Sequence, residues 1–208
     1  MAAGARCERV GVSPDAVRAA YESVRAQVGP GVTVVAATKY VPLEEMGVLV
    51  EAGIDVVGEN RAQDMARKHE VYGDRFRWHF IGALQSNKAR LVSSMSELVH
   101  SLDTESAAQR LTVPCLLEVN LAGEASKSGV GESEIEGYLD RHPLICGLMT
   151  MPPFAADPEA SRATFRRLAQ LAREHGVPQL SMGTSQDWRV AVEEGATLIR
   201  IGSTLFRN

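Results

Sequence analysis

Short runs of apolar residues alternate along this chain with longer segments in which charged and apolar positions are spaced as in a helix. The apolar runs are rich in β-branched residues, and their lengths are typical of strands that are covered on both faces. Eight such runs predict strands, at residues 32–39, 55–59, 78–81, 98–102, 115–120, 145–151, 180–183 and 198–202. Helices are predicted between them, at residues 43–52, 61–71, 133–140, 158–174 and 187–194.

One more helix is predicted before the first strand, at about residues 14–28. Apolar residues recur there at helical spacing, from Val17 to Val28. Ser13 followed by Pro14 is a favourable start, because a serine can cap the first turn and a proline fits the first helical position.

Eight strands alternating with helices predict an α/β fold, a single parallel (β/α)₈ barrel formed by one domain over residues 1–208. Gly53 and Gly195 stand between a helix and a strand, which is where such units place a glycine. The competing fold is an open doubly wound sheet, which usually has a glycine-rich turn after its first strand. Here that turn reads KYVPL at residues 39–43, so the pattern favours the barrel.

Composition narrows the expected partners and compartment. The chain has 208 residues, 45% of them hydrophobic, a net charge of -4, and scattered lysines and arginines, so we expect no nucleic-acid partner. No apolar run has the length of a signal peptide or a membrane span, so we expect no membrane association. Cys7, Cys115 and Cys146 are widely spaced and match no zinc motif. We therefore expect buried thiols, no metal and a location in the reducing cytoplasm.

Lys39 is the most informative residue for the chemistry. It ends the first predicted strand, and barrels of this kind carry their function at the carboxyl ends of the strands. Burial disfavours an ammonium ion, so a lysine between an apolar core and an open mouth is suited to present a neutral amine, which can form a Schiff base with an aldehyde. The alternative is a lysine whose side chain simply extends into solvent.

The last two predicted strands end in small, polar residues. Gly183-Thr184-Ser185 lies at the end of the seventh strand, and Gly202-Ser203-Thr204 at the end of the eighth. Turns of this composition expose backbone N–H groups that can bind a phosphate, at the place where barrels often bind one. The alternative is a pair of ordinary helix N-caps.

Arg200 lies within the eighth strand, on the same face as Leu198 and Gly202. An arginine in an otherwise apolar strand needs an acceptor, either a carboxylate such as Glu59 or a heteroatom of a ligand. An amine, a phosphate-binding turn and a central arginine together suggest a phosphorylated aldehyde. Pyridoxal 5′-phosphate fits, with its aldehyde at Lys39, its phosphate at the two turns and its ring nitrogen at Arg200.

Seven segments of the chain resemble the YggS/PROSC family of pyridoxal phosphate homeostasis proteins, over about residues 32–206. They read AATKY, GENRAQ, WHFIGALQSNKAR, LEVNLAGEASKSG, GLMTM, LSMGTSQDW and GATLIRIGSTLF. The resemblance implies a fold-type III barrel similar to the N-terminal domain of bacterial alanine racemase. Thr184 departs from the family, which usually has a methionine there, and the segments after Asp103 and Met151 are shorter than usual.

The resemblance also assigns roles to individual residues. It implies that Lys39 forms the Schiff base and that Arg200 faces the pyridine nitrogen. It places Ser185, Gly202 and Ser203 at the phosphate, and it implies that Asn60 and His79 line the pocket.

For function, the resemblance implies a carrier that holds pyridoxal 5′-phosphate for intracellular homeostasis and releases it to apo-enzymes without catalysis. An arginine at the ring nitrogen disfavours its protonation, which weakens the electron sink that carbanion chemistry needs. Tyr40 would point away from Lys39 if the extended strand continued. The alternatives are a racemase or decarboxylase of amino acids completed by a partner chain, and a lysine aldolase acting on sugar phosphates. We expect a monomer.

Two further features carry little weight: a glycine-containing segment and the remaining histidines. Residues 123–129 superficially resemble a phosphate loop but lack the glycine before the lysine, so a P-loop is not predicted. The histidines outside the predicted site are expected at solvated helix or loop positions; they are His69, His100, His142 and His175.

Overall fold

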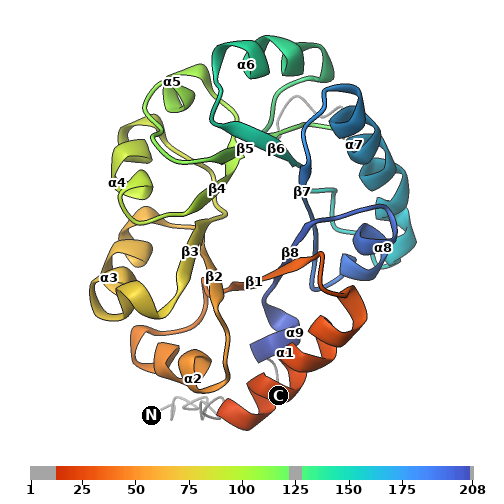
Figure 1. Ribbon diagram of the computed structural model, residues 1–208. Helices are drawn as coiled ribbons and strands as arrows, with labels where there is room; N and C mark the ends of the chain where they lie inside the picture. Colours follow the sequence, from red (N-terminus) through yellow and green to blue (C-terminus); the bar gives the residue numbers. More distant parts are fainter. Residues whose placement is uncertain (1–12, 122–127, 207–208) are drawn as a thin grey trace, which may run out of the picture.

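The computed structural model describes residues 13–121 and 128–206. Its strands are β1 (Thr33–Ala37), β2 (Val56–Glu59), β3 (Arg77–Phe80), β4 (Leu98–Leu102), β5 (Cys115–Glu118), β6 (Ile145–Met149), β7 (Gln179–Thr184) and β8 (Leu198–Ile201). Each strand pairs in parallel with the next, and β8 pairs with β1, so the sheet closes into a barrel (Figure 1). The predicted (β/α)₈ barrel is confirmed, and the open sheet is excluded.

Helices form a ring around the strands (Figure 1). The α-helices are α1 (Pro14–Val28), α2 (Met46–Glu51), α3 (Ala62–Tyr72), α4 (Ala89–Ser93), α5 (Glu105–Ala108), α6 (Ile135–Arg141), α7 (Arg162–Glu174), α8 (Trp188–Glu193) and α9 (Ser203–Phe206). Helices α2, α6 and α7 are each preceded by a 3₁₀ turn, at Leu43–Glu45, Glu132–Glu134 and Pro158–Ser161. Ser13 occupies the N-cap position of α1, but its side chain makes no capping hydrogen bond within the described residues.

Two apolar clusters build the core. The larger one lies between the strands and the helices and contains fully buried side chains such as Met46, Met65 and Phe165. The smaller one consists of Val35, Val56, Leu98, Leu116, Met149 and Leu198. Each of these comes from a different strand, so this cluster fills the barrel interior. Two residues further along β5 and β8, on the same face, lie Glu118 and Arg200, and the interior becomes polar there.

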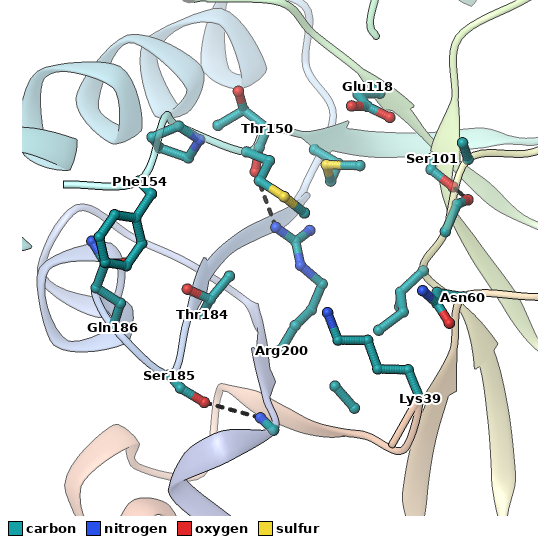
Figure 2. A pocket seen from close by; sticks show the side chains of 18 of the residues that line it. Lys39, Asn60, Ser101, Glu118, Thr150, Phe154, Thr184, Ser185, Gln186 and Arg200 are labelled. Atoms are coloured by element: carbon teal, nitrogen blue, oxygen red, sulfur yellow. Dashed lines mark hydrogen bonds between the residues drawn. The ribbon is translucent and has the colours of Figure 1, made fainter. Parts of the chain in front are cut away.

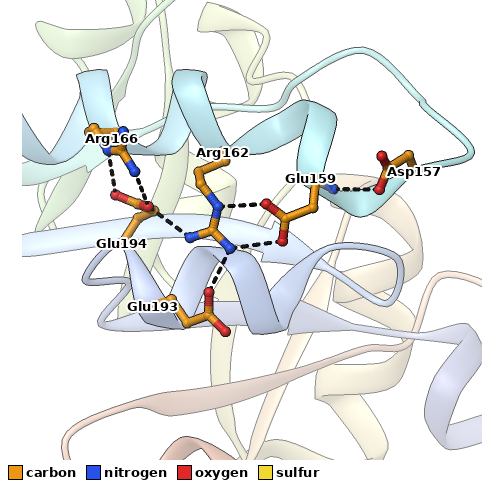
Figure 3. Close-up of polar contacts among 6 residues, drawn as sticks. All are labelled: Asp157, Glu159, Arg162, Arg166, Glu193 and Glu194. Carbon is orange, nitrogen blue, oxygen red and sulfur yellow. Dashed lines mark hydrogen bonds and ion pairs between the residues drawn. The ribbon is translucent and has the colours of Figure 1, made fainter.

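Ion pairs join α7 to α8 on the outside of the barrel (Figure 3). Arg162 donates to Glu159, Glu193 and Glu194, and Arg166 also contacts Glu194. Hydrogen bonds from Arg166 and Arg162 lower the pKa of the Glu194 carboxyl to about 2. Single surface pairs contribute little stability, but a shared network restrains the helices that it connects. It therefore steadies α8, which begins directly after the loop that carries Ser185.

Two findings bear on the composition of the chain. In residues 13–121 and 128–206, no helix is both long and apolar enough to cross a membrane. Cys115 is buried and Cys146 is half-buried, and both are free thiols; Cys7 lies outside the described residues. Burial raises the pKa of Cys115 to about 12, so this thiol stays protonated at neutral pH.

Candidate functional site

A cavity of about 1270 Å³ opens at the carboxyl ends of the strands. Its lining includes Lys39, Asn60, Glu118, Thr150, Ser185 and Arg200 (Figure 2). These residues come from six different strands or from the loops that follow them, so the barrel itself brings together side chains that are far apart in sequence. The volume exceeds the few hundred Å³ that suffice for a small ligand.

Lys39 lies in a turn beyond the end of β1. The strand ends at Ala37, and the Val41 N–H donates to the Thr38 carbonyl at 2.9 Å, which closes a turn over residues 38–41. Lys39 and Tyr40 are its two central residues; both are exposed and both line the cavity. The Lys39 Nζ atom lies 4.8 Å from the centroid of the Tyr40 ring. The expectation of a strand reaching residue 39, with Tyr40 pointing away, is therefore wrong because the chain turns.

Arg200 projects from β8 into the cavity and is only 4% exposed. Its Nη1 donates to Ser181 Oγ at 2.7 Å, and its Nη2 donates to the Thr150 carbonyl at 3.1 Å. Its Nε has no hydrogen-bond partner within the described residues. Glu59 pairs with Lys68 instead, so it does not neutralise this guanidinium. Burial lowers the pKa of Arg200 to about 10, which leaves it positively charged at neutral pH.

His79 lies in the barrel interior and is not among the residues that line the cavity. Its Nδ1 is 2.9 Å from His100 Nε2, and His100 Nδ1 is 2.8 Å from Ser181 Oγ. His79 thus reaches Arg200 only through two other side chains. His100 is fully buried in β4, so the expectation that it is solvated is wrong.

Burial keeps both interior histidines neutral. It lowers the pKa of His79 to about 4 and holds the pKa of His100 well below its usual value. Neutral rings can each donate one hydrogen bond and accept another, which suits a chain of contacts in an interior that already contains a guanidinium.

The three residues predicted to bind phosphate lie together. Ser185, Gly202 and Ser203 all line the cavity, and Ser185 Oγ accepts from the Gly202 N–H at 3.0 Å and the Thr204 N–H at 3.3 Å. Figure 2 draws the hydrogen bond between the Gly202 N–H and Ser185. The two N–H groups thus hold the Ser185 hydroxyl at the edge of the cavity, and its hydrogen remains available as a donor to an anion.

Gly183 was predicted to belong to a phosphate-binding turn, but its role is in packing. It is not a lining residue; its φ is +92°, and a Cβ there would lie 2.6 Å from the Ala191 Cβ. The glycine therefore lets β7 pack closely on α8. Asp187 then fixes the loop, because its Oδ1 accepts from the Thr184 N–H at 2.8 Å and its Oδ2 accepts from Ser161 at 2.8 Å.

Several lining residues were not predicted from the sequence. Glu118 is 8% exposed and accepts a hydrogen bond from Ser128 Oγ at 2.6 Å, and burial raises the pKa of its carboxyl. The spacing of two residues from Leu116, on the same strand face, could have indicated it. Phe154 is 88% exposed and stands at the mouth, in a segment without strand or helix periodicity. Of the segment 123–129, which superficially resembles a phosphate loop, residues 123–127 lie outside the described residues.

The barrel and its site define a known class. Residues 12–207 match the family model for the alanine racemase N-terminal domain. The structure of alanine racemase from Corynebacterium glutamicum has the same fold, with a TM-score of 0.72 over 93% of this chain and 61% of the other, at 17% sequence identity. That likeness concerns the fold alone.

Relatives of higher identity narrow the class. The pyridoxal phosphate homeostasis protein of Aquifex aeolicus is 39% identical over 82% of this chain and 84% of its own length, and that of Vibrio alginolyticus is 36% identical over 84% and 85%. PipY of Synechococcus elongatus, solved with pyridoxal phosphate bound, is 30% identical and gives a TM-score of 0.82 over 91% of this chain and 99% of PipY. The chain belongs to the family of pyridoxal phosphate homeostasis proteins, as its sequence predicted.

Proposed function

We propose that this protein binds pyridoxal 5′-phosphate at Lys39, holds it reversibly and releases it to apo-enzymes, as a component of pyridoxal phosphate homeostasis. One observation carries the proposal: the Lys39 amine, the Arg200 guanidinium and the turn at Ser185 and Gly202 open into a single cavity. The cofactor itself supplies an aldehyde, which forms a Schiff base with a lysine amine.

The residues present fit the cofactor. Arg200 offers a buried Nε donor without a partner in the described residues, which suits an acceptor such as an unprotonated pyridine nitrogen. The Ser185 oxygen accepts from the Gly202 and Thr204 N–H groups, which leaves its hydroxyl hydrogen as the donor that suits a phosphate. Asn60 lines the same cavity as Lys39 and can orient a ring substituent (Figure 2).

The same geometry favours a protein that holds the cofactor rather than an enzyme that uses it for catalysis. Proton transfer needs a positioned base across from the lysine. The tyrosine lining the cavity within the described residues is Tyr40, which is 86% exposed and adjacent to Lys39. A cationic arginine at the ring nitrogen also disfavours the protonated ring that acts as a strong electron sink.

The binding proposal is tested by titrating the protein with pyridoxal 5′-phosphate, recording the visible spectrum, reducing with borohydride and mapping the labelled peptide. We expect a new band and a label on Lys39, both lost in Lys39→Ala and both kept in the control Lys88→Ala. A label spread evenly over the lysines, or one that Lys39→Ala does not remove, would contradict the proposal.

The carrier role is tested separately with the loaded protein. We expect cofactor transfer that restores activity to an apo-enzyme, and no exchange of the α-hydrogen of amino acids with deuterated solvent. Rapid exchange at catalytic turnover would favour the racemase or decarboxylase alternative.

A further inference from the structure

A buried ion pair lies behind the turn that carries Lys39. We propose that Lys68 and Glu59 position Lys39, by holding the turn over residues 38–41 in the form that directs the Lys39 amine into the cavity. The inference rests on the proposed function, because it assigns a purpose to the placement of Lys39. Neither Lys68 nor Glu59 lines the cavity.

The contacts of Lys68 converge on the turn. This side chain extends from α3, is 6% exposed, and its Nζ donates to the Thr38 carbonyl at 2.8 Å and to Glu59 Oε1. Thr38 Oγ1 donates to the same Glu59 oxygen at 2.6 Å. The Thr38 carbonyl is also the acceptor for the Val41 N–H, so one oxygen both closes the turn and binds the buried ammonium.

The ion pair of Lys68 and Glu59 can act on Lys39 through the Thr38 carbonyl. It belongs to the peptide bond between Thr38 and Lys39, so fixing it fixes the start of the Lys39 residue. The sequence of residues 32–39 favours a continued strand, in which Lys39 and Tyr40 would point to opposite sides. The turn instead places both at the cavity. A non-local contact from α3 therefore opposes the local preference of the chain.

Stability alone is a poor explanation for the pair. Replacing a buried ion pair by apolar side chains of similar size is often neutral or stabilising, because two charges must be desolvated. Here the hydrogen bonding of the carboxylate is also incomplete, since Glu59 is fully buried and its Oε2 has no partner within the described residues. What the pair does provide is a fixed connection between the ends of β1 and β2, which are followed by Lys39 and Asn60.

The test compares two variants of the full chain with one control. Lys68→Met removes the donor to Thr38, and Glu59→Gln/Lys68→Met removes it without leaving an unpaired buried carboxylate. The control is Phe165→Leu, a substitution in the fully buried core under α7, away from the turn. Three quantities are measured: amide exchange of residues 38–41 in the ligand-free protein, the dissociation constant for pyridoxal 5′-phosphate, and the share of borohydride label on Lys39.

Both Lys68 variants should show faster exchange at residues 38–41, a dissociation constant raised on the order of tenfold, and a smaller share of label on Lys39. Phe165→Leu should lower the stability without these effects. Wild-type exchange and wild-type affinity in the double variant would overturn the inference. If Lys68→Met does not fold, the double variant decides.

Failure of the proposed function would look different. In that case wild-type protein itself would carry no label on Lys39, whereas amide exchange in the ligand-free variants would still show whether Lys68 holds the turn.

Discussion

Arg200 is the residue whose surroundings most restrict what the site can bind. Its two terminal nitrogens donate to neutral acceptors, a hydroxyl and a carbonyl, and no carboxylate among residues 13–121 and 128–206 cancels its charge by direct contact. A buried guanidinium held by neutral groups retains its attraction for an electron-rich ligand atom. The unpartnered Nε makes that atom an acceptor rather than a donor.

Replacing Arg200 by methionine should therefore weaken cofactor binding. Losing one charge-assisted hydrogen bond to the ring should raise the dissociation constant for pyridoxal 5′-phosphate by about 10- to 100-fold. The measurement is an absorbance titration, with Met149→Leu in the same cavity as the control. Unchanged affinity in a folded Arg200→Met protein would show that Arg200 does not contact the cofactor.

The site residues that sequence could indicate are those with unusual chemistry for their position. Lys39, Arg200 and Ser185 interrupt or end apolar runs and stood out for that reason. Glu118 also ends a strand but lay inside a longer apolar run, and Phe154 stands in a segment without periodicity. The hydrogen bonds of His79 and His100 join residues 21 positions apart, a pairing that no local pattern reveals.

At the scale of elements, both ends of every strand were predicted to within two residues, because buried parallel strands give continuous apolar runs. The first strand was overextended by two residues, because the chain turns at residues 38–41, where Lys68 of α3 donates to the Thr38 carbonyl. The 3₁₀ turns before α2, α6 and α7 were assigned to the helices, because the apolar spacing does not change there.

The junction of β7 and α8 gives a test at this scale. Gly183→Ala places a side chain at a φ of +92° and 2.6 Å from the Ala191 Cβ, so both backbone strain and overpacking oppose it. The free energy of unfolding should fall by about 2 kcal/mol or more. Denaturant unfolding measures this, and Gly31→Ala is the control, because nothing lies within 4 Å of its added Cβ.

An equal, small change in the two alanine variants would show that β7 can move away from α8. The loss in Gly183→Ala should be accompanied by weaker binding of pyridoxal 5′-phosphate, because Thr184 and Ser185 follow directly on this glycine.

At the scale of the whole molecule, the barrel combines an apolar interior layer with a polar column that runs towards the cavity. Val35, Leu116 and Leu198 belong to the apolar cluster. His79, His100, Ser181 and Arg200 form the column, each joined to the next by a hydrogen bond. The column supports the guanidinium from inside the barrel, and we expect it to make the stability of the fold sensitive to acid.

The sign of this sensitivity follows from the lowered pKa values of the two histidines. In the unfolded chain His79 takes up a proton below its usual pKa of 6.5, whereas in the folded protein its pKa is about 4. The unfolded state therefore binds more protons between these values, and stability present above about pH 6.5 is lost as the pH falls towards 4. His79 alone accounts for about 3 kcal/mol, and His100 adds to it in the same direction.

Denaturant unfolding at a series of pH values between 7 and 4.5 measures this loss. The variant His79→Gln/His100→Gln keeps polar side chains in the column but cannot titrate, so its free energy of unfolding should depend less on pH than that of wild type. His175→Gln, at the end of α7, should retain the wild-type slope. The exposed carboxylates are common to all three proteins, so their titration cancels in the comparison. An equally steep slope in the double variant would assign the acid sensitivity to groups outside the barrel interior.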